Sequence, residues 1–507
     1  MWYAARMTLR AAALALVVVP TVAHADPREL LRAGLDAMGG EARVRALRGL
    51  KIEAIGHTLH PEQSERPEGP YIANYDQSVA WRDLAGRRAL ERREERGAFY
   101  AEWTPTTTFV TDAASYRVAA DGIAPGDLAS YEDGQEALGL APERVLATAI
   151  DAADVVHDGR ERAEGLDQDV VRFTWRGRAV RVLLNPHTHL PTLVEVTRAY
   201  PENVFLWIWG DVRARTSYGN WQLVGGIALP FSSWRTVNGL PDRDQTITKV
   251  VLDPTDAPWP AIDDKTRAAA EERVRKGPPP FAFAAASSGR ELADGIRFYP
   301  GRWNTTLVRM DDGVVVLEAP IASEYTEGVA AEAARAFPGA PLRAVVSTSD
   351  AWPHVGGVRA YAARGVPIYA FELTRPLLAR LLDAPHALRP DAWERRRQAE
   401  PRAAADIRPV VGRTPIGAGP NRIELYPVRG EGSERMVMAY FPGRKLLYAS
   451  DLIQPLPDGG FYNPVYLVEI VAAVAREKLA VDTVFAMHAG PTPWADVSAA
   501  AARVRRP

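Results

Sequence analysis

The sequence predicts an α+β protein with more than one domain, in which a curved antiparallel β-sheet domain precedes a second domain of layered helices and strands. Three observations predict this class. Short strand-like segments separated by turn clusters fill the first half of the chain, proline clusters interrupt this pattern near the middle, and strands alternate with helices after the interruption. A length of 507 residues leaves room for two or three hydrophobic cores.

The first domain is predicted over residues 26–255. Apolar residues at helical spacing predict a helix that begins at Asp26 and ends at Gly39 and Gly40. Strand-like patterns with turn clusters between them follow this helix. Because short turns join antiparallel neighbours, the pattern favours one antiparallel sheet. The clearest strands are 170–175, 179–184, 192–197 and 246–251.

Residues 256–290 are predicted to be a linker, since the proline cluster 278–280 lacks the N–H groups that a sheet ladder requires. The second domain covers residues 291–507. Its strand-like and helical segments are 304–310, 313–318, 324–336, 343–347, 356–364, 366–371, 373–382, 435–441, 446–450, 464–478 and 483–487. The Arg- and Pro-rich segment 383–419 fits neither pattern, and we predict a partly helical insertion there.

The first 25 residues have the composition of a secretory signal peptide. Arg6 and Arg10 precede the apolar run 11–19, and Ala23 and Ala25 form a cleavage site of small residues. The apolar run is too short to span a bilayer, and no second long apolar stretch follows, so no membrane span is expected. We therefore predict a periplasmic or secreted protein, with an uncleaved interfacial anchor as the alternative.

The composition excludes several classes of function. The chain has no Cys, which excludes disulfides, thiolate metal sites and Cys nucleophiles. A formal net charge of −2 gives no electrostatic reason to expect a nucleic acid partner. The sequence contains no Gly-x-Ser-x-Gly elbow and no dinucleotide-binding fingerprint. The predicted partner is an unknown small molecule or apolar ligand.

The segment 347–357, written STSDAWPHVGG, lies between a predicted strand and a predicted helix, where a ligand loop is expected. His354 is the only evident metal ligand in this loop. The loop belongs to a series of features that, in this order, resembles the metallo-β-lactamase fold family over roughly residues 290–500. The features are Asn304 in an early strand, Glu318 at the end of another, Gly356 and Gly357 after the loop, Asp451 after Ser450, and His488 before Gly490.

This resemblance implies an αββα domain with a reduced metal site. Aligned on Gly356 and Gly357, three of the four family ligands in the loop fall on Ser349, Ala351 and Pro353, and a later family His falls near Gly432. The ligands that remain are His354, Asp451 and His488. Two His and one carboxylate can hold one zinc ion and leave a position open for water. The resemblance therefore implies a hydrolase with at most one metal ion that uses metal-bound water on an unknown substrate, with Asp350 as the candidate catalytic carboxylate.

Purely structural roles are the alternative for these residues, because His and Asp often cap helices or satisfy backbone groups. The N-terminal domain also resembles, more loosely, the curved sheets of periplasmic lipoprotein-carrier and lipoprotein-sorting proteins. That likeness implies an apolar ligand on the concave face of the sheet. The second hypothesis is therefore a catalytically inactive binding or scaffold protein, a pseudoenzyme whose sheet domain holds an apolar ligand or a partner.

Overall fold

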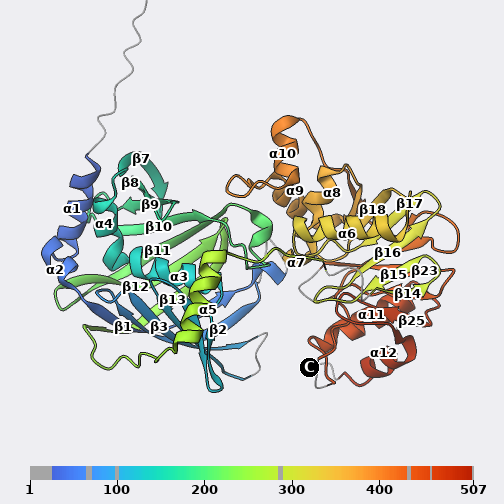
Figure 1. Ribbon diagram of the computed structural model, residues 1–507, viewed down its shortest axis with the longest axis horizontal. Coiled ribbons are helices and arrows are strands. Elements are labelled where there is room, and N and C mark those ends of the chain that lie inside the picture. Colours follow the sequence, from blue (N-terminus) through green and yellow to red (C-terminus); the bar gives the residue numbers. More distant parts are fainter. Residues whose placement is uncertain are drawn as a thin grey trace, which may run out of the picture.

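The computed structural model describes residues 26–63, 71–97, 102–283, 289–430, 435–456 and 459–504. The predicted signal peptide, residues 1–25, lies outside these ranges, and so does Gly432. The described chain mixes helices with a large antiparallel sheet in the first half and two smaller sheets in the second (Figure 1).

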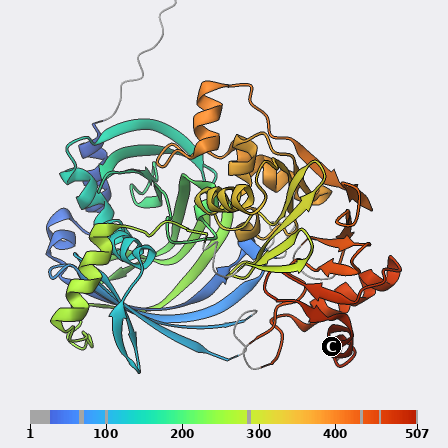
Figure 2. The same cartoon turned by 45° about the vertical axis from the view of Figure 1, so that its right-hand side comes forward.

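The large sheet has 13 strands, and every neighbouring pair is antiparallel. Its order is β6-β5-β4-β3-β2-β1-β13-β12-β11-β10-β9-β8-β7, so two meanders meet where β1 pairs with β13. The antiparallel sheet predicted for the first half is confirmed, and Figure 2 shows how strongly it curves. Its strands are β1 Gly49–Leu59, β2 Ala73–Asp83, β3 Arg88–Gly97, β4 Thr104–Thr111, β5 Ser115–Ala119, β6 Gly122–Pro125, β7 Val156–Ala163, β8 Leu166–Trp175, β9 Arg178–Leu184, β10 Pro191–Arg198, β11 Val212–Val224, β12 Ile227–Val237 and β13 Leu240–Leu252.

Helices cover one side of this sheet. The early helix is α1, and it is followed after Gly39 and Gly40 by α2; both glycines have positive φ, which L side chains rarely adopt. Buried residues of α1, α2 and α4 share a core with β8, β9, β10 and β12. The helical elements of this half are α1 Pro27–Ala37, α2 Glu41–Ala46, α3 Leu128–Gly139, α4 Pro142–Asp151 and the short 3₁₀ turns η1 Pro61–Gln63 and η2 Trp207–Trp209.

The segment predicted as a linker packs against both halves of the molecule. It contains α5 (Asp264–Lys276), whose residue Ala270 is buried in a small core with Trp81 and Phe109 of the large sheet. Further along, Phe283 packs against Tyr325 of the second half, with ring centroids 5.2 Å apart. Residues 256–290 therefore contribute contacts to both the sheet domain and the second half of the molecule.

The second half contains two sheets that face each other across one core. Buried strand residues of both sheets, among them Val316 and Val346 of one and Leu425 and Phe485 of the other, belong to the same hydrophobic cluster. The seven-stranded sheet, in the order β14 to β20, consists of β14 Arg290–Ala293, β15 Ile296–Tyr299, β16 Thr305–Met310, β17 Gly313–Leu317, β18 Leu342–Ser347, β19 Ile368–Phe371 and β20 Ile407–Val410. The six-stranded sheet, in the order β21 to β26, consists of β21 Thr414–Ile416, β22 Ile423–Val428, β23 Met436–Phe441, β24 Leu446–Tyr448, β25 Thr483–Phe485 and β26 Thr492–Pro493.

Helices pack against both sheets. Buried residues of α6 and α8, such as Val329 and Tyr361, belong to the cluster that contains the strands of the seven-stranded sheet. Figure 1 shows α12 below the strands of the six-stranded sheet. Apolar residues of α11 and α12, such as Leu467 and Val497, share a second cluster with the outer face of β22, β23 and β24. The helices are α6 Ser323–Ala336, α7 Trp352–Val355, α8 Val358–Ala363, α9 Arg375–Asp383, α10 Ala392–Ala399, α11 Pro464–Arg476, α12 Trp494–Ala501 and the 3₁₀ turn η3 Glu372–Thr374.

The segment predicted as an insertion, 383–419, supplies strands to both sheets of the second half. The segment contains the helix α10 and two strands. Strand β20 pairs with β19 of the seven-stranded sheet, and β21 pairs with β22 of the six-stranded sheet. Among the described residues, no helix has both the length and the apolar character needed to cross a bilayer.

Candidate metal centre

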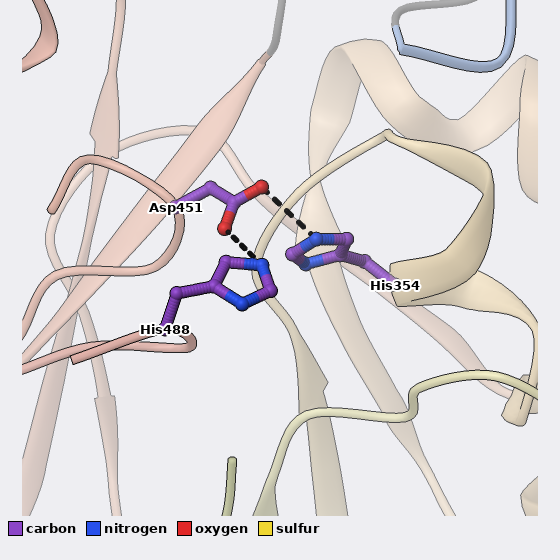
Figure 3. A group of neighbouring side chains, drawn as sticks. All are labelled: His354, Asp451 and His488. Atoms are coloured by element: carbon purple, nitrogen blue, oxygen red, sulfur yellow. Dashed lines mark ion pairs between the residues drawn. The ribbon is translucent and has the colours of Figure 1, made fainter. Parts of the chain in front are cut away.

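Three side chains from three separate segments converge at one point between the two smaller sheets. One ligand atom from each of His354, Asp451 and His488 lies within 4.8 Å of the others. Nε2 of His354 lies 3.0 Å from Oδ2 of Asp451, and Nε2 of His488 lies 3.1 Å from Oδ1. Figure 3 shows the carboxylate between the two imidazole rings. The three residues predicted as metal ligands are therefore neighbours in space.

The loop that carries His354 is fixed by contacts with the segment after β17. The N–H of Ile321 donates to the carbonyl of Pro353 at 2.6 Å, and the N–H of Gly357 donates to the carbonyl of Ala319 at 2.8 Å. A Cβ atom at Gly356 would lie 2.2 Å from the carbonyl oxygen of Ile321, which is closer than real Cβ contacts come. Gly356 is therefore required by this close approach of two backbones.

Asp451 and His488 follow neighbouring parallel strands, β24 and β25, so the ends of these strands bring them to one edge of the sheet. Asn304 holds the turn before His488, since its N–H donates to the carbonyl of Met487 at 2.9 Å and its side-chain amide donates to that of Ala486 at 3.0 Å. On the other side, the Ser450 hydroxyl donates to the carbonyl of Thr348 at 3.1 Å. These bonds connect the loop of His354 to the strand ends that carry its two neighbours.

The surroundings of His488 fix one of its protons. Nδ1 lies 3.0 Å from the carbonyl oxygen of Arg302, which can only accept, so Nδ1 carries a proton, and Nε2 is directed toward Asp451. The His488 side chain is 26% exposed, whereas those of His354 and Asp451 are almost completely buried. The group of three is therefore reached by solvent from the side of His488.

The two imidazoles keep Asp451 ionised. Burial disfavours the charged carboxyl, but the charge of His354, its hydrogen bond and the corresponding contributions of His488 outweigh burial and hold the pKa of Asp451 well below its ordinary value. An ionised, buried carboxylate between two imidazole nitrogens provides both the negative charge and the lone pairs that a divalent cation requires.

Glu318, which the sequence singled out only as part of the resemblance, is the fourth ionisable group of the site. It follows β17 with φ of +82° and is completely buried. Its Oε1 accepts hydrogen bonds from the hydroxyls of Thr348 and Tyr448, and its Oε2 lies 4.0 Å from Nδ1 of His354. Burial raises the pKa of Glu318 to about 7, although the charge of His354 and the two hydroxyls oppose the shift.

Asp350 lies near His354 in the sequence, but its carboxylate contacts Arg435. Its Oδ1 accepts from the backbone N–H of Arg435 at 3.0 Å, just before β23, and Nε of Arg435 lies 3.9 Å from its Oδ2. It is not one of the three residues that converge. The structure gives Asp350 an anchoring contact, and its role in catalysis stays a prediction.

Ser349, Ala351 and Pro353, in the same loop, have structural surroundings. The Ser349 hydroxyl accepts from the N–H of Ala351 at 3.1 Å, and Pro353 occupies the first turn of α7, where a missing N–H costs nothing. Ala351 and Pro353 are both buried, and neither carries a ligand atom in its side chain. The loop is therefore folded around a single imidazole, that of His354.

Residues of the sheet domain pack against α7, the helix that carries His354. The rings of Trp209 in η2 and Trp352 in α7 pack edge to face, with centroids 5.1 Å apart, and both side chains are almost completely buried. The turn η1 also contacts α7. The first half of the chain therefore supports the element from which His354 projects.

The residues present fit one metal ion. Two imidazoles and one carboxylate form an accepted ligand set for zinc, and metal-bound His commonly donates its second N–H to a carbonyl or carboxylate. His488 meets this condition through the carbonyl of Arg302, and Nδ1 of His354 faces Glu318. Ser349, Ala351 and Pro353, where the resemblance would place further ligands, carry neither an imidazole nor a carboxylate.

Comparisons with known proteins show only distant similarity. No family model matches the chain, and no curated protein matches it. Among solved structures, it is similar to a metallo-β-lactamase from Pontibacter korlensis at 17% identity, over 42% of this chain and 97% of that one, with a TM-score of 0.33. It is also similar to a metallo-β-lactamase from Hirschia baltica, at 17% identity over 42% and 96% of the two chains with a TM-score of 0.32. The inverting sec-alkylsulfatase Pisa1 from Pseudomonas sp. matches at 17% identity over 42% of this chain and 40% of its own, with a TM-score of 0.32.

Proposed function

We propose that the protein is an exported hydrolase-like protein with an αββα metallo-β-lactamase-like domain that binds one zinc ion through His354, Asp451 and His488. The observation that supports this function is the convergence of three ligand atoms within 4.8 Å at the edge where two sheets meet. A bound zinc ion would act as a Lewis acid and lower the pKa of water toward neutrality, which is the chemistry that hydrolysis requires.

The side chains around the ion would each have a distinct task. Asp451 supplies the negative charge, His488 provides the side that is open to solvent, and His354 is held by the buried loop. Because Oε1 of Glu318 accepts two hydrogen bonds from hydroxyls, Oε2, which lies 4.0 Å from Nδ1 of His354, is the oxygen that faces the second N–H of a zinc-bound imidazole. Glu318 is thus a positioning residue for the imidazole of His354.

Metal analysis of the full chain tests the proposal. After zinc loading and dialysis, we expect about one zinc ion per chain, and we expect its loss in His354→Ala and in His488→Ala. The matched control is His187→Ala, which removes an exposed imidazole outside the group. A parent chain that retains no zinc, or a His354→Ala/His488→Ala double variant that retains it fully, would refute the single-metal function.

The second candidate function is ligand binding by the sheet domain without catalysis. It is supported by a cavity of about 570 Å³ on the inner side of the large sheet. Because its lining residues include none of His354, Asp451 and His488, metal loss and ligand binding can be measured independently.

A further inference from the structure

The cavity of about 570 Å³, which is partly open to solvent, is lined by side chains of β1 to β4 and β10 to β13, with α3 and the start of α4 across it. Small-molecule sites usually have volumes of about 300 to 1,000 Å³. The volume therefore fits a bound molecule, and the side chains around it indicate which kind.

An aliphatic strip runs through the cavity along the paired strands β1 and β13. The strand register places Ile52 opposite Val250 and Ala54 opposite Ile247, and Ala80 of β2 lies opposite Ile52 on the other side. All five side chains line the cavity. Because apolar surface is removed from water when an apolar group covers it, this strip favours an aliphatic portion of a ligand.

Uncharged polar groups flank the strip on both sides. Ser78 of β2 and Thr106 and Thr108 of β4 line one side, and Thr216 of β11 and Ser233 of β12 line the other. Hydroxyl groups donate and accept hydrogen bonds without requiring a charge on the ligand. The ligand should therefore carry oxygen atoms at positions beside its aliphatic portion.

The charged side chains that line the cavity are paired with opposite charges in the lining or next to it. The lining includes four arginines and five carboxylates, and each has an oppositely charged partner. Within the lining, Arg82 pairs with Glu143 at 2.6 Å, Arg235 with Asp242 at 3.0 Å and Arg243 with Glu91 at 3.7 Å. Arg93 pairs with Asp76 at 2.9 Å. Arg198 pairs with Glu136 at 3.2 Å and also with Asp133. A charged ligand would lose its hydration and find its opposite charges already paired, whereas an uncharged ligand avoids this cost.

We propose that the cavity binds an uncharged amphiphile, a molecule with one aliphatic chain and hydroxyl or ester oxygens. The chain lies along the β1–β13 strip, and the oxygen atoms bond to the flanking hydroxyls. This proposal rests on the second candidate function and deepens it, since it replaces a purely apolar ligand by a class that the hydroxyls and paired charges select.

Three probes with the same twelve-carbon chain test the class of ligand. Monolauroylglycerol is uncharged, laurate is anionic and dodecyltrimethylammonium is cationic. Isothermal titration of the full chain, below the micelle concentration of each probe, should show one molecule of monolauroylglycerol per chain, bound at least tenfold more tightly than either charged probe. Equal or tighter binding of a charged probe would overturn the uncharged class alone. If none of the three binds, the second candidate function fails as well.

Two variants place the bound molecule in this cavity. Ala80→Phe fills the space beside Ile52 and should weaken monolauroylglycerol binding at least tenfold, whereas Gln77→Phe adds the same side chain on the exposed face of the same strand and should leave it unchanged. Thr216→Val removes a hydroxyl at nearly constant volume and should weaken binding severalfold, which keeps the test valid if Ala80→Phe does not fold. Unchanged binding in Thr216→Val and in a folded Ala80→Phe would overturn the assignment to this cavity.

Discussion

Oε2 of Glu318 lies 4.0 Å from Nδ1 of His354, while Nε2 of the same imidazole lies 3.0 Å from Asp451. His354 therefore lies between two buried carboxyl groups with different protonation. Burial raises the pKa of Glu318 to about 7, whereas the imidazoles hold the pKa of Asp451 well below its ordinary value. Near neutral pH the two carboxyls therefore carry less than two negative charges, which limits the repulsion between them.

The protonation of Glu318 can be tested by two substitutions. Because the neutral carboxyl and an amide have nearly the same shape, Glu318→Gln should reduce the free energy of unfolding at pH 6 by less than about 1 kcal/mol. Glu318→Ala removes the acceptor shared by Thr348 and Tyr448 and leaves a cavity, so it should cost about 2–4 kcal/mol. Urea unfolding measures both values.

An exposed glutamate provides the comparison for these variants. Glu400→Ala removes a carboxylate that pairs with Arg396 at the surface, and it should change stability by less than about 0.5 kcal/mol. Should Glu318→Gln prove as damaging as Glu318→Ala, the site requires the negative charge of Glu318 rather than its shape.

Strands with a continuous apolar pattern could be predicted from the sequence, whereas a helix whose apolar stripe is interrupted by a polar residue could not. The predicted strands 313–318 and 343–347 correspond to β17 and β18 within one residue. In contrast, α3 was missed, although its buried residues Leu128, Tyr131, Gln135 and Leu138 lie at helical spacing, because Gln135 interrupts the apolar stripe. Gln135 bonds the backbone carbonyl of Thr111, a partner that the sequence does not indicate.

The candidate metal centre, too, could be predicted from the sequence only in part. His354, Asp451 and His488 could be selected because the family resemblance places each of them after a strand. The contacts of Glu318 could not be predicted, since Thr348 and Tyr448 come from strand ends far apart in the sequence. The segment 383–419 looked irregular because its arginines and Trp393 bond backbone carbonyls of other helices, a pattern that has no period in the sequence.

Arg359 should be the most sensitive charged residue of the second half outside the metal group. It is 1% exposed, donates to both carboxylate oxygens of Asp391, at 2.7 and 3.2 Å, and bonds the carbonyls of Leu381, Leu382 and Ala384. Arg359→Ala leaves these buried acceptors unpaired and should cost about 3–5 kcal/mol in chemical unfolding. The exposed Arg395, replaced by Ala, is the control and should cost less than about 0.5 kcal/mol.

His386 should make the protein less stable in mild acid. It is buried between the halves of the molecule, where Nε2 lies 3.2 Å from the carbonyl of Ile208. Burial and then the charge of Arg359 lower its pKa to about 4, against the opposing effects of Asp391 and Asp211. Between pH 6.5 and 4 the unfolded chain binds more protons at this residue than the folded one, so stability is fully present above pH 6.5 and falls as the pH falls.

The variant His386→Gln isolates this contribution. In the parent, the protons that the unfolded chain binds at His386 should lower the free energy of unfolding by about 1 kcal/mol per pH unit as the pH falls from 6 to 4.5. The variant should lose that part of the slope, and His187→Gln, at an exposed position, should retain it. An identical slope in His386→Gln and the parent would show that His386 is charged in the folded state.

Trp209 couples the sheet domain to the candidate metal centre. It packs edge to face on Trp352 of α7, the helix that carries His354, and its side chain is 2% exposed. Trp209→Ala should cost about 3–5 kcal/mol in urea unfolding through the cavity it leaves. Because α7 then loses its outer support, zinc retention should fall as well. Trp234→Ala removes the same side chain from a site where it is 42% exposed, and it should leave zinc retention unchanged. If Trp209→Ala lowers stability but keeps full zinc retention, the metal group is held by the second half alone, and the first half is a separate ligand-binding unit.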